Sequence, residues 1–539
     1  MINKPKLKLK KFYFHPITVF IFLTLLVIIL SGILSALQTQ ASYNTININA
    51  IKAKSISSKE LEPNLIIVEN LLSFDGIKFL ISNAAKNFLS FGPLGMLLLS
   101  LIGITIAEGT GFIETLTRRH ISKIPKTTVT FLLIFISTIS SLINEVGYAI
   151  LIPLAALIYF INKRNPILGI ITAFCGVSFG YGVSIFVGSM EVNLMNYTKE
   201  AAMLIDETTH ISLTSNLIFI IIATIILSIV GTIVIEKLIG PKVGKYKKEE
   251  EFSQTEQYKV INIEEEEQKE IEKDKKEKRG LRFALVISIF ILIIFVYSLI
   301  PKLPFSGMLL DMKETIYVNQ LFGENSYFQD GFSFLVSLVL ILSGIAYGIG
   351  SKSIKSDKEI IENASKKFSG IGSIIILIFV VSQFIAVFRK SNIGMVVTAW
   401  LATLLEHLSL SGIPLIVVTL ILIAIANLFL TSPTSKWMIF SPVVVPMFMQ
   451  SNISPQFAQI IMRAGDSMTK GYTPLLASFV IYIGYLNIYN WQKEKPYTIR
   501  KSLQLITPYF LIISATWILI IIGWYLIGLP IGPGVNPTL

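Results

Sequence analysis

Two ionisable residues lie one helical turn apart in an otherwise apolar part of this sequence. They are Arg463 and Asp466, whose i, i+3 spacing puts both side chains on one face of a helix. On that face they could pair with each other and serve only the structure. Alternatively, the planar guanidinium of Arg463 binds the carboxylate of a small molecule, while Asp466 binds a cation. The two interpretations predict different partners for each side chain.

A further carboxylate, Glu145, follows Asn144 in the polar stretch Ser140–Gly147, which interrupts a long apolar segment. An ionised carboxylate at the centre of a bilayer costs about 2.5–3.5 kcal/mol, so it normally faces a water-filled pathway or a partner. Glu145 is therefore a candidate ion-binding residue, and Asn144 is a candidate substrate contact. In the alternative interpretation the polar stretch lies at shallow depth, and Glu145 contacts only water.

A second polar stretch, Thr431–Trp437, interrupts another apolar segment. Its hydroxyl groups, together with the backbone carbonyls that Pro433 leaves without a donor, could coordinate a cation or a polar substrate. Thr434 and Ser435 are therefore candidate substrate contacts. The indole of Trp437 could stack on an aromatic ring of a ligand, or it could pack inside the protein.

Four other polar residues accompany these stretches. The ammonium of Lys436 could extend outward to water along its apolar stem or take a buried role, and of the two the outward position is expected. Asn392 offers an amide oxygen beside Gly394, where we expect a helix to break. Arg389 and Lys390 are unusual at membrane depth, and the sequence assigns them no role.

The elements that must position these residues are membrane-spanning helices. The chain is 53% hydrophobic and 15% charged, whereas soluble domains carry about 25% charged residues. Apolar runs of about 20 residues, long enough to cross a bilayer, recur from end to end. The net charge of +12 fits basic cytoplasmic loops better than nucleic-acid binding. Cys175 is the only cysteine, which excludes intrachain disulfides and thiolate metal clusters.

Both polar stretches lie within segments that are expected to enter and leave on one side of the membrane. Lys and Arg flank both ends of the segment 127–161, so both ends belong in the cytoplasm. Its 35 residues fall short of the roughly 40, plus a turn, that two crossings need. The segment 414–454 carries no Lys or Arg close to either end, so both of its ends are expected outside. We therefore expect two re-entrant hairpins.

Prolines and glycines indicate that the two hairpin regions are copies of one another. Five of them recur 289 positions later: Pro125 as Pro414, Pro153 as Pro442, Pro166 as Pro455, Gly176 as Gly465 and Gly182 as Gly471. Such residues mark helix starts and breaks. With hairpins that enter from opposite sides, this pattern is typical of an inverted-topology repeat.

The predicted fold is an all-α integral membrane protein with about nine transmembrane helices and two re-entrant hairpins. An N-terminal half, 1–236, and a C-terminal half, 283–539, are joined by a charged cytoplasmic linker, 237–282. The Lys- and Glu-rich linker is expected to be a tether, either disordered or a charged helix. The lysine-rich N-terminus belongs in the cytoplasm, and the uncharged end 528–539 belongs outside. The crossing helices are expected near 15–38, 88–116, 166–189, 214–236, 283–300, 331–350, 372–398, 456–488 and 503–528.

Four stretches of the sequence resemble the AbgT family of p-aminobenzoyl-glutamate transporters: Asn87–Gly95, Ser441–Met449, Phe457–Asp466 and Gly528–Gly534. The resemblance runs from His15 to the C-terminus and is interrupted only by the charged linker. It implies a homodimer whose protomers have nine transmembrane helices and two hairpins. It also implies uptake of p-aminobenzoyl-glutamate or export of sulfonamide-like antimetabolites.

By position, the resemblance also implies roles for individual residues. Asn392 and Asp466 fall on the positions of a sodium site. Substrate and coupling positions of the family fall on Thr434, Trp437, Pro455, Arg463, Asp466 and Pro474.

This sequence departs from the family pattern in both polar stretches. Asn144 and Glu145 stand where the family usually has Ser-Asp. Thr434 replaces a serine, and Pro433 and Lys436 stand where small or apolar residues are usual. The departures concern the substrate and the coupling ion rather than the fold.

We therefore expect an ion-coupled secondary active transporter of a bacterial cytoplasmic membrane. Its substrates would be p-aminobenzoyl-glutamate-like aromatic carboxylates or related antimetabolites, moved by symport or antiport. The alternative is a carrier of dicarboxylates or other organic anions from the wider ion-transporter superfamily. An intramembrane hydrolase would need a nucleophile with its base, or a His-Glu-x-x-His metal motif, and the sequence offers neither. No Walker-type motif is present, so ATP is not expected to supply the energy directly.

Overall fold

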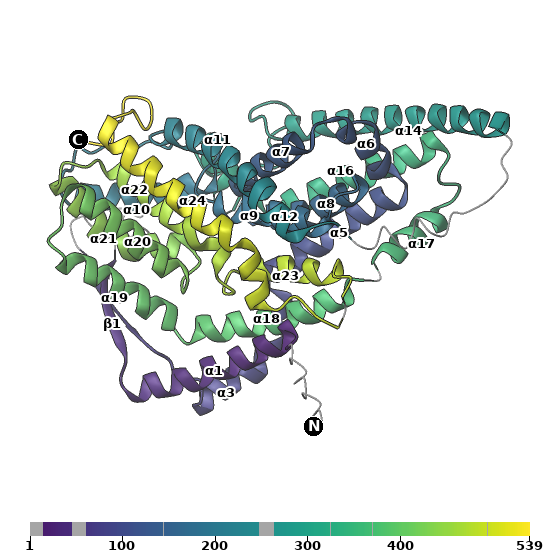
Figure 1. Cartoon of the computed structure of the whole chain (residues 1–539). Coiled ribbons are helices and arrows are strands. Elements are labelled where there is room, and N and C mark those ends of the chain that lie inside the picture. Colours follow the sequence, from purple (N-terminus) through teal and green to yellow (C-terminus); the bar gives the residue numbers. More distant parts are fainter. Residues whose placement is uncertain are drawn as a thin grey trace, which may run out of the picture.

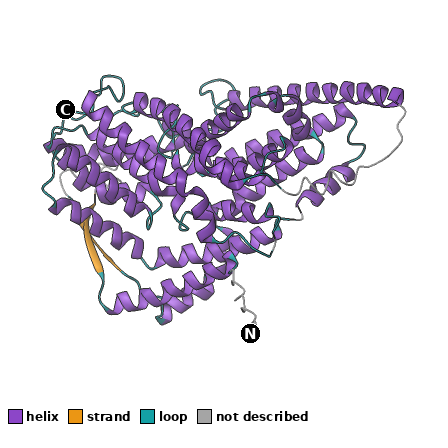
Figure 2. Cartoon of the chain, in the orientation of Figure 1, coloured by secondary structure: helices purple, strands orange, loops and turns teal. Residues whose placement is uncertain are grey.

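Backbone groups in a bilayer find no water to bond, so a chain this apolar folds into helices whose backbone bonds are internal. The computed structural model of the chain describes residues 14–45, 61–143, 145–246, 263–323, 325–368, 370–492 and 494–539. Within these ranges helices dominate, and the strands form one antiparallel ribbon of β1 (Gln40–Thr45) and β2 (Glu62–Ile67) (Figure 2). The predicted helical membrane fold is confirmed.

Eight helices of the described residues are long and apolar enough to cross a membrane. Their outer faces expose large apolar side chains such as Leu285 and Leu519, as contact with lipid requires. The eight are Pro16–Ala36 (α1), Gly92–Gly109 (α5), Lys126–Ile143, Leu217–Val243, Ile271–Ser298, Tyr327–Ser351 (α16), Gly372–Lys390 (α18) and Ile499–Ile527 (α24).

Two of the predicted crossing helices are wrong, because each is interrupted midway. The helix expected over 166–189 ends at Phe179, and a second helix begins at Ser189. The helix expected over 456–488 is likewise split by an irregular segment. The observed helices are α9 (Pro166–Phe179), α10 (Ser189–Met203), α22 (Pro455–Thr469) and α23 (Phe479–Ile488). Both interrupted helices begin at a proline, Pro166 or Pro455, and these two prolines are a pair of the predicted repeat, which itself stays a prediction.

The break predicted beside Asn392 is present. Helix α18 ends at Lys390, and α19 (Ile393–His407) begins after Asn392, which adopts a left-handed conformation with φ of 59°. The predicted end at 398 is wrong, since α19 continues to His407 through a run of good helix formers.

Each predicted hairpin is a pair of helices joined by a short turn. The first consists of α7 (Lys126–Ile139), the single turn η2 (Ser140–Ile143) and α8 (Val146–Ile161). The second consists of α20 (Gly412–Asn427) and α21 (Pro433–Gln450). The arms have 14, 16, 16 and 18 residues, or roughly 21 to 27 Å at the helical rise, and the first arm together with η2 is the span Lys126–Ile143 counted above. The membrane side from which each hairpin enters stays a prediction.

The charged linker continues without a break into the membrane helix that follows it. Helix α14 (Ile263–Ser298) contains both, and Figure 1 shows it reaching beyond its neighbours. Arg119 of α6 (Phe112–Arg119) binds Asp274 at 2.6 Å and Glu277 at 2.7 Å. Two forms were expected for the linker, disorder or a charged helix, and residues 263–282 adopt the helix. Residues 247–262 lie outside the described residues.

The two ends of the described chain pack against α18 and against the end of the second hairpin. Helix α1 packs on α18, with the rings of Phe20 and Phe384 centred 5.5 Å apart. Near the C-terminus, the carbonyl of Pro537 accepts the Ser454 N–H at 2.8 Å, beside the end of the second hairpin.

The remaining elements are α3 (Phe74–Ser82), α4 (Ala84–Leu89), η1 (Ile121–Lys123), α11 (Leu217–Val234), η3 (Ile235–Ile239), α12 (Gly240–Val243), α15 (Tyr317–Phe322), α17 (Asp357–Phe368) and η4 (Lys470–Tyr472).

Candidate functional site

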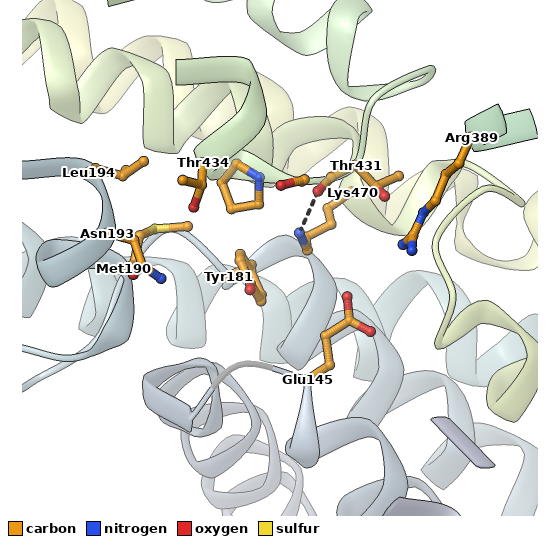
Figure 3. Close-up of a pocket in the computed structure, with 11 residues that line it drawn as sticks. Glu145, Tyr181, Met190, Asn193, Leu194, Arg389, Thr431, Thr434 and Lys470 are labelled. Carbon is orange, nitrogen blue, oxygen red and sulfur yellow. Dashed lines mark hydrogen bonds between the residues drawn. The ribbon is translucent and has the colours of Figure 1, made fainter. Parts of the chain in front are cut away.

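The tips of the two hairpins face one another across a cavity of about 260 Å³, which we call the central cavity (Figure 3). Glu145 lines it from the first tip, and the segment Thr431–Thr434 lines it from the second. Adjoining hollows of about 410 and 700 Å³ share Arg389 with it. The other residues around the central cavity are Tyr181, Met190, Asn193, Leu194, Arg389 and Lys470.

The irregular segment after α9 is held in place by side chains of α22. The N–H of Gly182 donates to Ser467 Oγ at 2.6 Å, and Arg463 Nε donates to the Gly182 carbonyl at 2.7 Å. A Cβ at Gly182 would lie 2.4 Å from Ser467 Oγ, so only glycine allows this approach. The N–H and the carbonyl of Gly182 are thus both satisfied within the protein, as irregular backbone away from water requires.

Arg463 does not pair with Asp466, although the spacing allows it. The guanidinium instead forms an ion pair with Glu191 in the first turn of α10, and the two side chains are only 3% and 5% exposed. Glu191 also accepts the N–H of Gly188 at 2.7 Å through Oε2. Arg463 does not line the central cavity, and its role in substrate binding stays a prediction.

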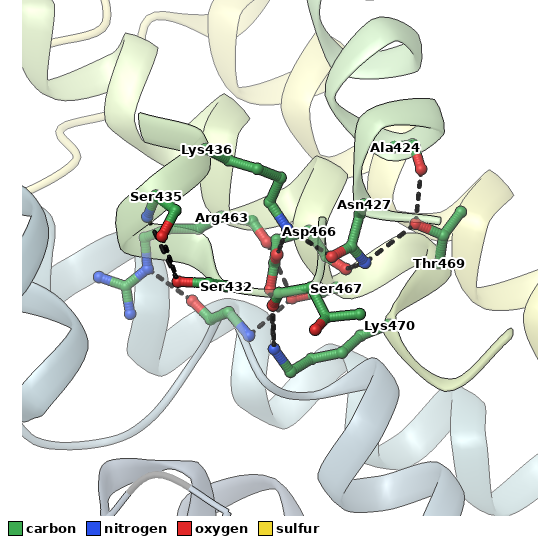
Figure 4. A network of polar contacts seen from close by, with 12 residues as sticks. Ala424, Asn427, Ser432, Ser435, Lys436, Arg463, Asp466, Ser467, Thr469 and Lys470 are labelled. Atoms are coloured by element: carbon green, nitrogen blue, oxygen red, sulfur yellow. Dashed lines mark hydrogen bonds and ion pairs between the residues drawn. The ribbon is translucent and has the colours of Figure 1, made fainter. Parts of the chain in front are cut away.

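Asp466 lies in a buried network between α20, α21 and α22 (Figure 4). Its Oδ1 accepts from the ammonium of Lys436, which also donates to Asn427 Oδ1. Its Oδ2 lies 3.5 Å from Nζ of Lys470. The expectation that Lys436 extends outward to water is wrong, because the side chain is fully buried. A carboxylate and an amide oxygen lie within its reach, so the ammonium finds partners without leaving the protein.

Two cations border the central cavity. Lys470 donates to the carbonyl of Thr431 at 3.2 Å, and its Nζ lies 3.7 Å from the ring centroid of Tyr181, a cation–π contact. Arg389 comes from the C-terminal end of α18 and forms no ion pair within the described residues. Its neighbour Lys390 is paired with Glu69. Arg389 is therefore the guanidinium that is available to a ligand in this cavity.

Glu145 lies on the opposite wall from the second hairpin tip (Figure 3). Its Oε2 accepts the hydroxyl of Ser478 at 2.6 Å, so the first tip is tied to the irregular segment before α23. Glu145 therefore contacts more than water, and the membrane depth of the first tip stays a prediction. Asn144, its neighbour in the sequence, lies outside the described residues.

The remaining predicted site residues fall into two groups. Thr434 lines the central cavity, and Ser435 and Asn392 line the adjoining hollow of about 410 Å³. Trp437 is fully buried and donates from Nε1 to Thr198 Oγ1 at 2.8 Å. Its indole therefore packs inside the protein, which was the alternative to stacking on a ligand. Pro455 and Pro474 do not line the central cavity: Pro455 starts α22, and Pro474 lies in the segment between α22 and α23. Their functional roles stay predictions.

Sequence reasoning missed four residues of this region. Glu191, Tyr181 and Lys470 were not among the candidate residues, and Arg389 was noted but was assigned no role. The i, i+4 spacing of Asp466 and Lys470 was a usable signal for a pair on one helical face. Glu191 gave no such signal, because its partner Arg463 lies 272 positions away.

Three comparisons relate this chain to known proteins. A family model described as "AbgT putative transporter family" matches residues 10–539. The p-aminobenzoyl-glutamate transport protein of Escherichia coli K12 is 29% identical over 527 residues, which cover 97% of this chain and 94% of that protein.

Two solved structures also match. The YdaH transporter of Alcanivorax borkumensis has 27% sequence identity and a TM-score of 0.46, with 96% of this chain and all of that chain covered. MtrF of Neisseria gonorrhoeae, described within a class of antimetabolite efflux pumps, has 28% identity and a TM-score of 0.46, with 97% and 98% covered.

Proposed function

This chain belongs to the AbgT family of transporters, and on that premise we propose that it is an ion-coupled secondary active transporter of p-aminobenzoyl-glutamate-like aromatic carboxylates or related antimetabolites. The related Escherichia coli protein carries p-aminobenzoyl-glutamate in its name. The central cavity between the hairpin tips is the proposed substrate site.

The observation that carries this proposal is the pairing of cations with aromatic and apolar surface in one cavity. Arg389 and Lys470 offer two positive groups, and a substrate of this class has two carboxylates. Tyr181, Met190 and Leu194 offer surface for an aromatic ring. Charge-assisted hydrogen bonds to carboxylates contribute about 1.5–3 kcal/mol each, so each cation contributes substantially to affinity and selectivity.

Coupling is assigned to carboxylates that border or support the cavity. Glu145 lines it directly, and Asp466 contacts Lys470, which lines it. One charge moved across about 150 mV supplies about 3.5 kcal/mol. That energy corresponds to roughly a few-hundred-fold concentration gradient, so a single coupling ion suffices for useful accumulation.

The proposal includes an orientation and an assembly. The basic end of α6, docked on the charged part of α14 through Arg119, would lie in the cytoplasm with the N-terminus. The C-terminus would lie outside, and the protein would work as a homodimer in the cytoplasmic membrane, as the family resemblance implies.

Uptake into proteoliposomes tests the function. We expect labelled p-aminobenzoyl-glutamate to accumulate only under an imposed ion gradient. Unlabelled substrate should compete, whereas an aliphatic dicarboxylate should compete poorly because it offers no ring to Tyr181. Equal competition by both would favour the dicarboxylate carrier, and uptake that merely equilibrates would indicate a passive channel.

A matched pair of variants tests the cavity assignment. Arg389→Gln removes one carboxylate partner and should weaken substrate binding about 10- to 150-fold, from the 1.5–3 kcal/mol of a charge-assisted bond. Lys390→Gln removes the adjacent cation, which is bound to Glu69 and does not line the central cavity, and should leave binding nearly unchanged. Equal effects of the two variants would argue against this cavity.

A further inference from the structure

The buried network around Asp466 has the chemistry of a cation site. It combines the carboxylate of Asp466 with the amide oxygen of Asn427, and both side chains are fully buried. Asn427 is the last residue of α20, so the negative end of a helix dipole also points there. Half-helix ends of this kind coordinate coupling ions in transporters with broken helices.

That position is already taken by a cation of the chain itself. The ammonium of Lys436 donates to both oxygens, Oδ1 of Asn427 and Oδ1 of Asp466. The remaining oxygen of Asp466 faces the ammonium of Lys470 at 3.5 Å. A sodium ion bound to Asp466 would therefore share a buried space with two positive charges, and like charges in such an environment repel strongly.

The second residue expected to hold sodium lies elsewhere. Asn392 donates from Nδ2 to the carbonyl of Ile67 at 3.1 Å. It lines the two adjoining hollows, and Asp466 lines neither of them. The residues present therefore do not fit a sodium ion shared between Asn392 and Asp466.

We propose that Lys436 is a fixed replacement for a sodium ion at Asp466. Its ammonium neutralises the carboxylate, fills the oxygen site and joins α21 of the second hairpin to α20 and α22. Sodium therefore neither binds at Asp466 nor is required for transport by this chain. Removing the ammonium leaves a carboxylate, an amide oxygen and a helix end, which together form a site that sodium can enter. This inference rests on the proposed function only where it speaks of transport.

Thermal unfolding of the purified full-length protein tests the replacement without a transport assay. We compare unfolding midpoints in sodium and potassium chloride at equal ionic strength. The wild type should give the same midpoint in both salts. Lys436→Ala should gain a saturable, sodium-specific rise of a few degrees, because a ligand that binds only the folded state stabilises it. Lys436→Arg keeps a cation at this position and should behave like the wild type.

A second substitution locates any sodium effect. Adding Asp466→Asn to Lys436→Ala should abolish the sodium response, since the carboxylate that would bind sodium in place of the ammonium is gone. A Lys436→Ala protein that folds and shows no sodium response would overturn the proposal. A sodium response that survives Asp466→Asn would overturn it as well.

Measurements on the wild type keep the proposal testable even if Lys436→Ala does not fold. Equilibrium binding of radioactive sodium should show no saturable site that depends on Asp466. Saturable binding that Asp466→Asn removes would refute the replacement. If the wild type fails to transport p-aminobenzoyl-glutamate while Lys436→Ala gains sodium-dependent stability, the replacement stands and the proposed substrate falls.

Discussion

Replacing Arg463 separates a structural role from a substrate-binding role. The guanidinium is paired with Glu191, and both side chains are almost fully buried. In Arg463→Gln the carboxylate of Glu191 would keep the Gly188 N–H but lose its counter-ion. Leaving one member of a buried pair without its partner costs about 3–5 kcal/mol. The substitution also removes the bond from Arg463 Nε to the Gly182 carbonyl, which holds the break after α9.

The free energy of unfolding should therefore fall by several kcal/mol, visible as a drop in the thermal unfolding midpoint of the purified protein. The double variant Glu191→Gln with Arg463→Gln leaves no buried charge and should recover part of the loss, with an interaction energy of about 0.5–3 kcal/mol. Arg500→Gln, at an exposed position at the start of α24, serves as the control and should change little.

The opposite result would refute this reasoning. If Arg463→Gln is as stable as the wild type and only weakens substrate binding, then Arg463 is free to meet the substrate. Its pairing with Glu191 would then be dispensable, and the central cavity would have to extend to Arg463.

Three further predictions concern coupling, topology and the linker. Asp466→Asn should abolish gradient-driven accumulation while the protein still inserts and dimerises; accumulation with the ion dependence of the wild type would return Asp466 to a purely structural role. Single cysteines placed in 118–126 and 162–165 should react with an impermeant reagent from the cytoplasm, and those in 401–413 and 450–455 from outside. The background labelling should be low, because Cys175 is fully buried. Labelling of the first two ranges from different sides would exclude the first hairpin. Deleting 250–275 should leave transport largely intact although it removes Asp274, because Arg119 keeps Glu277; loss of transport by an inserted deletion protein would reveal a docking or regulatory role.

The two helix pairs of the predicted hairpins could be anticipated because their determinants are local. Flanking basic residues and the short span of 127–161 indicated the first, and the paired prolines Pro125 and Pro414 mark the starts of both. The predicted repeat also held a signal for the interrupted helices, since Gly182 and Gly471, which lie 289 positions apart, fall in the two breaks.

The partners of the buried charges could not be predicted in the same way. Lys436 of α21 pairs with Asp466 of the next helix, α22. The sequence alone offered no reason to prefer that pair over an ammonium directed outward to water. Arg463 and Asp466 share a helical face, but they do not pair with each other. In the folded protein Arg463 pairs with Glu191, and Asp466 pairs with Lys436. Local spacing limits which pairs can form, and packing of distant segments decides which do form.

The central claim is that an ion gradient drives substrate through the cavity between the hairpin tips. Its most direct test is accumulation of labelled p-aminobenzoyl-glutamate in proteoliposomes that carry an imposed pH gradient in sodium-free buffer, before and after an ionophore collapses the gradient. We expect the internal concentration to rise well above the external one, to fall back when the gradient is collapsed, and to fail to rise with Arg389→Gln at low substrate concentration. Equal internal and external concentrations with the gradient intact, whether or not sodium is present, would contradict the claim.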